Sequence, residues 1–169
     1  RTSEGAEVAV KVLRPGIGAA FARDLDLFFW LAELIERREP RLRRLKPRAV
    51  VETLAASVSR EMDLRFEAAA ASELRDNFRD DPGFRVPRVD WLRTSGQVLT
   101  LERVAGIRID DRAALVAAGH DVHAIMENAA RAFFIQVFRD GFFHADLHPG
   151  NLFIERSGAI AVVDFGIMG

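Results

Sequence analysis

The sequence predicts an α+β fold, because long helical patterns fill its first half and short apolar strands surround its polar motifs. Apolar residues recur at three- and four-residue steps over residues 17–38 and again after Pro47, which is typical of amphipathic helices. Shorter segments rich in Val and Ile, such as residues 7–13, are bounded by Gly, Pro or Ser and predict strands. At 169 residues, the chain is long enough for one domain or for a unit of two lobes.

Composition excludes several classes of function. Charge is balanced, with 24 Lys and Arg residues against 25 Asp and Glu residues, so we expect no nucleic-acid partner. Cysteine is absent, which excludes a disulfide framework and a thiolate metal site and fits a cytoplasmic location. No apolar run is long enough for a membrane span, and the first residue is Arg rather than Met. Because the chain also stops three residues after an Asp-Phe-Gly motif, we expect a protein truncated at both ends.

The first half predicts one strand and two helices. Residues 7–13 alternate as a strand, with the side chain of Lys11 opposite those of its two Val neighbours. Residues 17–38 predict the first helix, and Pro47 is well placed to open a continuous second helix that runs to about residue 78. Between them lies a basic connector, residues 37–48, which could meet anionic lipid head groups or be a solvated loop.

Three acidic residues in the middle of the second helix are candidates for a site. In a continuous helix Asp63 and Glu67 share one face, because they are four residues apart, whereas Glu61 points elsewhere. Such residues can form a solvated acidic face. Alternatively, Glu67 supplies the carboxylate that holds Lys11 in place.

The second half predicts shorter elements. Two strands surround the turn Thr94-Ser95-Gly96, and a hairpin of two further strands surrounds Ser157-Gly158. Two helices lie between these pairs, the first with Asp110 or Asp111 as its N-cap and the second ending at Gly141. The expected bounds are residues 84–92 and 97–103 for the first strand pair, 110–118 and 122–140 for the helices, and 152–155 and 159–163 for the hairpin.

The strongest functional signal is the segment His144–Asn151, HADLHPGN, followed by Asp164-Phe165-Gly166. The pattern is H-x-D-x-x-x-x-N, two short strands, and then D-F-G, and phosphoryl transfer requires these residue types at this spacing. Asp146 orients or deprotonates the attacking hydroxyl, whereas Asn151 and Asp164 reach the divalent cations that bridge the phosphates of a nucleotide. The sequence therefore predicts a kinase-like nucleotide site.

That site divides the chain into two expected parts. Residues 1–104 form a small-lobe-like part that holds the Lys11 strand, the two helices and a hinge. Residues 105–169 begin a large helical lobe with the catalytic loop and the Asp-Phe-Gly motif. In this arrangement, backbone groups of Glu102 and Val104 at the hinge would face the adenine of the nucleotide.

The chain resembles the UbiB/AarF family of atypical protein-kinase-like proteins along essentially its whole length. The resemblance rests on the segments VAVKVLRPGI, EMDLRFEAAAA, LTLERVAG, HADLHPGNLF and VDFGIMG. In ordinary kinases the helix Glu follows the strand Lys closely, but here two helical segments separate Lys11 from Glu67, which is similar to the insertion of this family. Glu61 and Asp63 match its E-x-D signature.

The resemblance implies a protein-kinase-like fold, with a small lobe that carries a helical insertion and with the start of the large helical lobe. It also implies binding of ATP or ADP with Mg²⁺, and a link to quinone biosynthesis or lipid homeostasis at a membrane. We accordingly expect an adenine nucleotide as the ligand, and membrane lipid or proteins of the quinone pathway as partners. The location would be cytoplasmic and peripheral, at the inner face of a membrane.

Residue roles carry over where the motifs match. Lys11 would contact the nucleotide phosphates, and Glu67 would hold it. Asp146 would be the catalytic Asp, and Asn151 and Asp164 would be the metal ligands. The other expected contacts to the cofactor come from Glu61, Asp63, Glu102, Val104 and His148.

Two departures from the family's pattern bear on activity. His148 stands where many protein kinases have a Lys that meets the transferred phosphate, which argues against efficient protein phosphorylation. The family's Ala-rich nucleotide loop and K-x-G-Q signature, expected before Lys11, are absent from the chain. We therefore expect the complete protein, rather than this fragment, to be active.

Two alternative functions fit the same motifs. Small-molecule phosphotransferases of the aminoglycoside and choline kinase type also use an H-x-D-x-x-x-x-N loop, but the long separation of Lys11 from Glu67 argues against them. A non-catalytic scaffold that responds to nucleotide would keep the same binding residues without turnover. Acceptor-dependent ADP release would support the first alternative, and binding without turnover would support the second.

Overall fold

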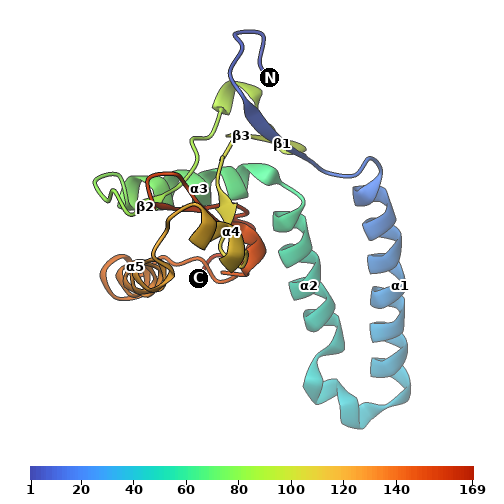
Figure 1. Ribbon diagram of the computed structural model, residues 1–169. Coiled ribbons are helices and arrows are strands. Elements are labelled where there is room, and N and C mark those ends of the chain that lie inside the picture. Colours follow the sequence, from blue (N-terminus) through green and yellow to red (C-terminus); the bar gives the residue numbers. More distant parts are fainter.

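The computed structural model describes residues 1–169 and confirms the predicted α+β class. Five α-helices and six short strands follow one another along the chain. Figure 1 shows how the helices are arranged in space. The strands are β1 (Val8–Val12), β2 (Phe84–Arg85), β3 (Val98–Glu102), β4 (Ile107–Arg108), β5 (Leu152–Ile154) and β6 (Ile160–Val162). The helices are α1 (Ile17–Arg38), α2 (Pro47–Glu61), α3 (Leu64–Asn77), α4 (Arg112–Ala117) and α5 (Val122–Phe134).

The strands form two small sheets. β1 and β3 pair antiparallel, with Lys11 opposite Leu99. The other four strands form one sheet in the order β2-β6-β5-β4. Within it, β5 and β6 are the predicted hairpin, and β6 also pairs in parallel with β2 through Phe84 and Ile160. The chain before the expected hinge therefore shares a sheet with the strand that leads to Asp164.

The core gathers on one side of α3. Its residues Leu64, Ala68, Ala71 and Leu74 recur at three- and four-residue steps and are at most 3% exposed. They belong to one buried cluster that also contains residues of β3, β5 and β6 and the ring of Phe165. Helix α3 is thus held by packing against the elements that surround the candidate site.

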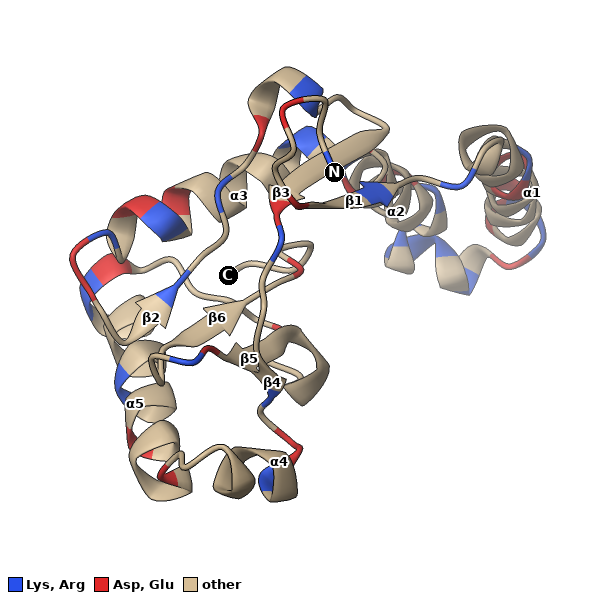
Figure 2. Cartoon of the chain, turned by 45° about the horizontal axis from the view of Figure 1, so that its top comes forward, with Lys and Arg blue, Asp and Glu red and all other residues tan.

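Helices α1 and α2 form a hairpin that projects away from the rest of the molecule (Figure 1). Of their side chains, only Ala32 and Val58 are buried. The hairpin turns through the 3₁₀ segment Pro40–Leu45, and its basic residues appear in blue at the end of the hairpin in Figure 2. None of the helices combines the length and the apolar character that crossing a membrane requires.

The predicted continuous helix from Pro47 to residue 78 is wrong, because the helix breaks at Met62 and Asp63. Asp63 has an extended backbone, with φ of −119° and ψ of 98°, and its carboxylate accepts a hydrogen bond from the backbone N–H of Arg65. Asp favours this N-cap position over a helix interior, since its side chain competes for backbone donors. Asp63 therefore precedes α3 and does not share a helix face with Glu67.

Two other bounds differ from expectation. The expected strand at residues 84–92 is regular only at Phe84–Arg85, because Pro87 has no backbone N–H to donate to a ladder. The expected helix at residues 122–140 does not stay α-helical to its end. Its last six residues, Ile135–Asp140, form a π-helical turn.

Replacing Leu74 tests the core position of α3. Because this side chain is fully buried, Leu74→Ala should lower the free energy of unfolding by about 2–5 kcal/mol through lost burial and a residual cavity. The matched control is Leu92→Ala, whose side chain is 95% exposed and whose loss should change stability by less than about 0.5 kcal/mol. Equal midpoints for the two variants in denaturant unfolding would show that α3 does not carry the core.

Candidate active site

Lys11 lies at the centre of the site. It points from β1 toward α3 and the Asp-Phe-Gly segment, with its Nζ atom 2.9 Å from both carboxylate oxygens of Glu67. The same Nζ atom donates to Oδ1 of Asp164 at 3.0 Å. Residues that are 56 and 153 positions away in the sequence thus meet at one ammonium group.

Glu67 is the buried member of this group, with 7% of its surface exposed. It lies in the first turn of α3, whose start is fixed by the Asp63 cap. Its Oε1 atom also accepts the backbone N–H of Phe165 at 3.2 Å. A buried carboxylate is stable only when charged and hydrogen-bonding partners surround it, and Glu67 has both.

Electrostatics keep the Lys11 ion pairs charged. Burial alone would lower the pKa of Lys11, but the hydrogen bonds and charges of Glu67 and Asp164 raise it above its ordinary value. Burial alone would likewise raise the pKa of Asp164, but the hydrogen bond and charge of Lys11 hold it below its ordinary value. At neutral pH the site therefore presents the Lys11 cation beside the Asp164 carboxylate, with Glu67 hydrogen-bonded to the same ammonium group.

His144 joins the catalytic loop to the Asp-Phe-Gly segment. Its ring is 1% exposed, and its Nε2 atom lies 2.5 Å from the backbone oxygen of Asp164. Its Nδ1 atom accepts the backbone N–H of Asp146 at 3.2 Å, so the ring proton belongs on Nε2, where it can be donated to Asp164. The imidazole thereby fixes Asp146 and Asp164 relative to each other.

Asp146 and Asn151 lie at the two ends of a short loop. Asn151 donates from Nδ2 to the backbone oxygen of Asp146 at 3.2 Å, and its own backbone oxygen accepts from Val163 at 2.9 Å. The Asp146 side chain is exposed, and its carboxylate accepts no hydrogen bond from the protein. A carboxylate in this position is free to meet a hydroxyl or a water.

Asp164 has a left-handed backbone, with φ of 66°. Non-glycine residues rarely adopt this conformation, and those that do are concentrated at active sites and ligand clamps. The conformation directs the carboxylate to Lys11 while the backbone oxygen reaches His144.

The donor set fits a divalent cation that is shared with phosphates. Asp164 uses Oδ1 for Lys11, but its Oδ2 atom and the Oδ1 atom of Asn151 form no hydrogen bond. Mg²⁺ prefers oxygen ligands and is commonly held by one or two carboxylates together with substrate phosphates. The chain has no cluster of three or more His, Cys, Asp or Glu residues that could hold a metal by itself.

The acidic residues before α3 border a cavity of about 450 Å³ next to Lys11. Asp63 lines it but is bound to the Arg65 guanidinium, which holds the pKa of the carboxyl below its usual value. Glu61, at the end of α2, is exposed, and its side chain forms no hydrogen bond. Lys11 is thus paired with Glu67, while Glu61 and Asp63 lie around the cavity beyond that pair.

The other residues that were expected to contact the cofactor differ in whether their polar groups are free to bind a ligand. The Glu102 side chain is paired with Arg85 and accepts the backbone N–H of Arg88. Its own backbone N–H donates to the Arg88 oxygen at 2.8 Å, so only the carbonyl of Glu102 is left for a ligand. The backbone N–H and carbonyl of Val104 form no hydrogen bond within the protein. His148 accepts the N–H of Gly150 on Nδ1 at 3.1 Å, as part of its own loop.

Two structural members of the site were absent from the set predicted from sequence. His144 belongs to the H-x-D pattern and could have been included on that signal. Gln136 is 1% exposed and accepts the backbone N–H of His144 at 2.9 Å. It had no sequence signal, because a polar residue in an apolar helix is usually on the solvated face.

Comparison with known proteins shows the family and the fold of this chain. The ABC1 atypical kinase-like domain matches residues 1–169. A protein of Marinobacter nauticus named "Probable protein kinase UbiB" is 44% identical, over 98% of this chain and 31% of the relative. A protein of the same name from Pseudomonas putida is 41% identical, over 100% of this chain and 32% of the relative. The chain thus spans about a third of the length of these curated relatives.

A solved structure has the same fold. The Rv3197 protein of Mycobacterium tuberculosis, in complex with erythromycin, superposes with a TM-score of 0.77 at 27% identity. The match covers 99% of this chain and 41% of that protein. The predicted protein-kinase-like fold is therefore confirmed, and the chain belongs to the UbiB/AarF family of atypical protein-kinase-like proteins through its ABC1 domain.

Proposed function

We propose that this chain forms the centre that binds ATP or ADP and Mg²⁺ in a UbiB-type atypical kinase or ATPase. The kinase-like family supports a phosphotransferase-like classification. The observation that supports nucleotide binding most directly is the meeting of Lys11, Glu67 and Asp164 from β1, α3 and the Asp-Phe-Gly segment. Phosphoryl transfer relies on such positioning and on neutralisation of phosphate charge.

The residues have distinct roles in this proposal. Lys11 neutralises the nucleotide phosphates and Glu67 holds the ammonium group toward them, while Asp164 and Asn151 supply oxygen ligands to the metal. Bound Mg²⁺ would supply the charge neutralisation that phosphate transfer requires. Asp146 orients the attacking hydroxyl or water. The free backbone groups of Val104 are suited to hydrogen bonds with adenine.

We propose that the two parts of the chain supply different residues of the site. Residues 1–104 supply the phosphate-binding Lys11, its partner Glu67 and the hinge, and residues 105–169 supply the catalytic loop and the metal ligands. The pairing of β2 with β6 couples the two parts, because it joins the segment after α3 to the strand before Asp164.

We further propose that the protein works at the cytoplasmic face of a membrane, with lipid or quinone-pathway proteins as partners. The quinone link is carried over from the family. The membrane link is supported by residues 37–48, which contain seven Arg or Lys residues and one Glu, for a net charge of +6, in a chain whose net charge is −1. Exposed Leu42, Leu45 and Val50 lie within or next to this segment. Basic residues interleaved with apolar ones suit an anionic lipid surface.

Asp164→Asn tests the metal site in the protein expressed from its complete open reading frame. The substitution removes the anionic metal ligand with little change in shape, so Mg²⁺-dependent ATP affinity should fall. Calorimetric titration with ATP, with and without Mg²⁺, measures this difference. Unchanged Mg²⁺-dependent affinity would remove Asp164 from the metal site.

Asp146→Asn should separate binding from turnover. Because Asp146 touches the nucleophile rather than the nucleotide, ATP affinity should persist while the rate of ADP release falls by about a hundred- to ten-thousand-fold. Retained turnover in this variant would contradict the catalytic role. In the wild type, binding without turnover would favour the nucleotide-responsive scaffold, and ADP release that depends on a small-molecule acceptor would favour the small-molecule phosphotransferase.

Neutralising the connector tests the lipid surface. The side chains of Arg41, Arg44 and Lys46 form no hydrogen bond within the protein. Their triple replacement by Gln should weaken binding to phosphatidylglycerol vesicles by about a hundredfold, at about 1 kcal/mol per charge. The matched control replaces the exposed Arg75, Arg79 and Arg112 by Gln and should bind like the wild type. Equal losses in both triple variants in vesicle sedimentation would refute a localised lipid contact.

A further inference from the structure

The segment after α5 is a π-helical turn, Ile135–Asp140. Its register is visible at its end, where the N–H of Gly141 donates to the carbonyl of Gln136, five residues back. Such turns contain one residue more than an α-helical turn and often occur next to functional sites. The candidate catalytic loop follows directly and begins with His144.

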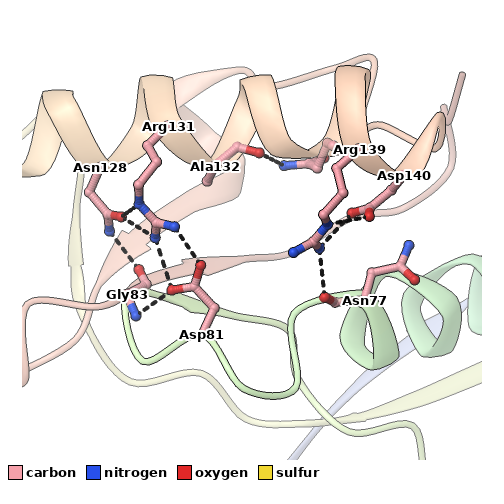
Figure 3. A network of polar contacts seen from close by, with 9 residues as sticks. Asn77, Asp81, Gly83, Asn128, Arg131, Ala132, Arg139 and Asp140 are labelled. Carbon is pink, nitrogen blue, oxygen red and sulfur yellow. Dashed lines mark hydrogen bonds and ion pairs between the residues drawn. The ribbon is translucent and has the colours of Figure 1, made fainter.

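The extra residue has a geometric consequence for two arginines. In a regular α-helix, residues eight positions apart point about 80° away from each other, whereas residues seven apart nearly share a face. Arg131 and Arg139 are eight apart, yet both contact the segment that leaves the end of α3, as Figure 3 shows. Because the π-helical turn contains one residue more than an α-helical turn, the side chains of both arginines point to the same side.

Arg139 binds the carboxyl end of α3. Its Nη2 atom donates to the backbone oxygen of Asn77, the last residue of the helix, at 2.8 Å (Figure 3). Its guanidinium lies 5.4 Å from the centre of the Phe78 ring and is oriented by two hydrogen bonds to Asp140, at 2.6 and 2.9 Å. The positive charge also lies at the negative end of the α3 dipole, where it is stabilising.

Arg131 fixes the loop that follows. It forms two hydrogen bonds with Asp81, at 2.7 and 2.9 Å, and Asn128 donates to the backbone oxygen of Gly83 at 2.7 Å (Figure 3). A Cβ atom at Gly83 would lie 2.9 Å from the Asn128 amide, so a larger residue would displace that side chain from its hydrogen bond. The same Gly83 oxygen accepts the N–H of Ile160, which ties the loop to β6.

Gln136, in the same turn, holds the catalytic loop. Its Nε2 atom donates to the backbone oxygen of Ala132 at 3.3 Å, and its Oε1 atom accepts the N–H of His144 at 2.9 Å. One short turn therefore holds both the helix that carries Glu67 and the histidine that fixes Asp146 and Asp164.

We propose that the π-helical turn positions the two halves of the candidate active site, with Arg139 as the positioning residue that acts on Glu67 through α3. Its catalytic consequence rests on the proposed nucleotide function. Glu67 and Asn77 are ten residues, or about 15 Å, apart on one helix, so a shift of the carboxyl end is transmitted to Glu67. The other end of α3 follows the interruption between α2 and α3, so continuity with α2 does not anchor the helix.

The N–H of Phe165 provides a readout that needs no nucleotide. It donates to Oε1 of Glu67, so its hydrogen exchange reports whether Glu67 stays in place. Arg139→Gln should make this exchange about three- to tenfold faster. This factor corresponds to the loss of one hydrogen bond from the charged guanidinium, which is weaker than usual because the group is exposed. The N–H of Val163, which donates to Asn151, should keep its exchange rate.

Two controls separate positioning from general loss of stability. Arg79→Gln removes a neighbouring exposed arginine whose side chain forms no hydrogen bond, and it should leave the Phe165 exchange rate unchanged. Asp121→Ala removes the N-cap of α5 and should destabilise the helix from its far end without a selective effect at Phe165. An unchanged Phe165 rate in Arg139→Gln, or a rise no larger than that in Asp121→Ala, would overturn the proposal.

A double-mutant cycle tests the route through Glu67. In the protein expressed from its complete open reading frame, Arg139→Gln should lower ATP turnover about three- to tenfold in the wild-type background, but should have no further effect beside Glu67→Gln. Additive losses would mean that Arg139 does not act through Glu67. If no variant binds nucleotide, the proposed function fails, while the exchange measurement still decides whether Arg139 positions Glu67.

Discussion

The contact of the Lys11 ammonium with Glu67 and Asp164 is the interaction on which the rest of the structure depends. Glu67 is buried, at 7% exposure, and ion-paired with Lys11, and a buried ion pair is tolerable only when its partners stay in place. Its partners come from two places, Lys11 from β1 and the Phe165 N–H from the Asp-Phe-Gly segment, while Glu67 itself is positioned by the start of α3. The contact therefore forms only when three features are correct together: the register of β1 on β3, the residue at which α3 begins, and the path of the chain after β6.

The same requirement explains why neutral hydrogen bonds hold the catalytic loop. His144 bridges two backbone groups with an uncharged ring, and Gln136 supports it with an uncharged amide. Both are buried, where additional charges would alter the balance among Lys11, Glu67 and Asp164. Lys11 and Asp164 are half-exposed at the face that could meet a ligand, whereas the residues that support the catalytic loop are a buried imidazole and a buried amide.

Much of the site could be predicted from sequence because phosphoryl transfer restricts which residues can serve it. Asp146, Asn151 and Asp164 stand at the spacing that the chemistry requires, and the family resemblance identified Glu67 as the partner of Lys11 across a long insertion. The structure brings Lys11, Glu67 and Asp164 together, while their roles in catalysis stay predictions.

Three features could not be predicted from sequence because local periodicity does not report them. The apolar pattern continues across Met62 and Asp63, so a break that depends on N-capping was not apparent. The pattern of α5 likewise continues into the π-helical turn, whose register depends on contacts with the end of α3. The partner of the short strand Phe84–Arg85 is β6, whose paired residues lie 76 positions further along the chain.

The break between α2 and α3 also makes the projecting hairpin a separable module. A continuous helix would turn Glu67 by about 100° for each residue gained or lost in the hairpin, and the Lys11 contact could not survive such changes. With α3 beginning anew at the Asp63 cap, the hairpin can lengthen, shorten or acquire a different surface without rotating the helix that carries Glu67. The chain can therefore diversify what it contacts through α1 and α2 while the geometry around Lys11 stays the same.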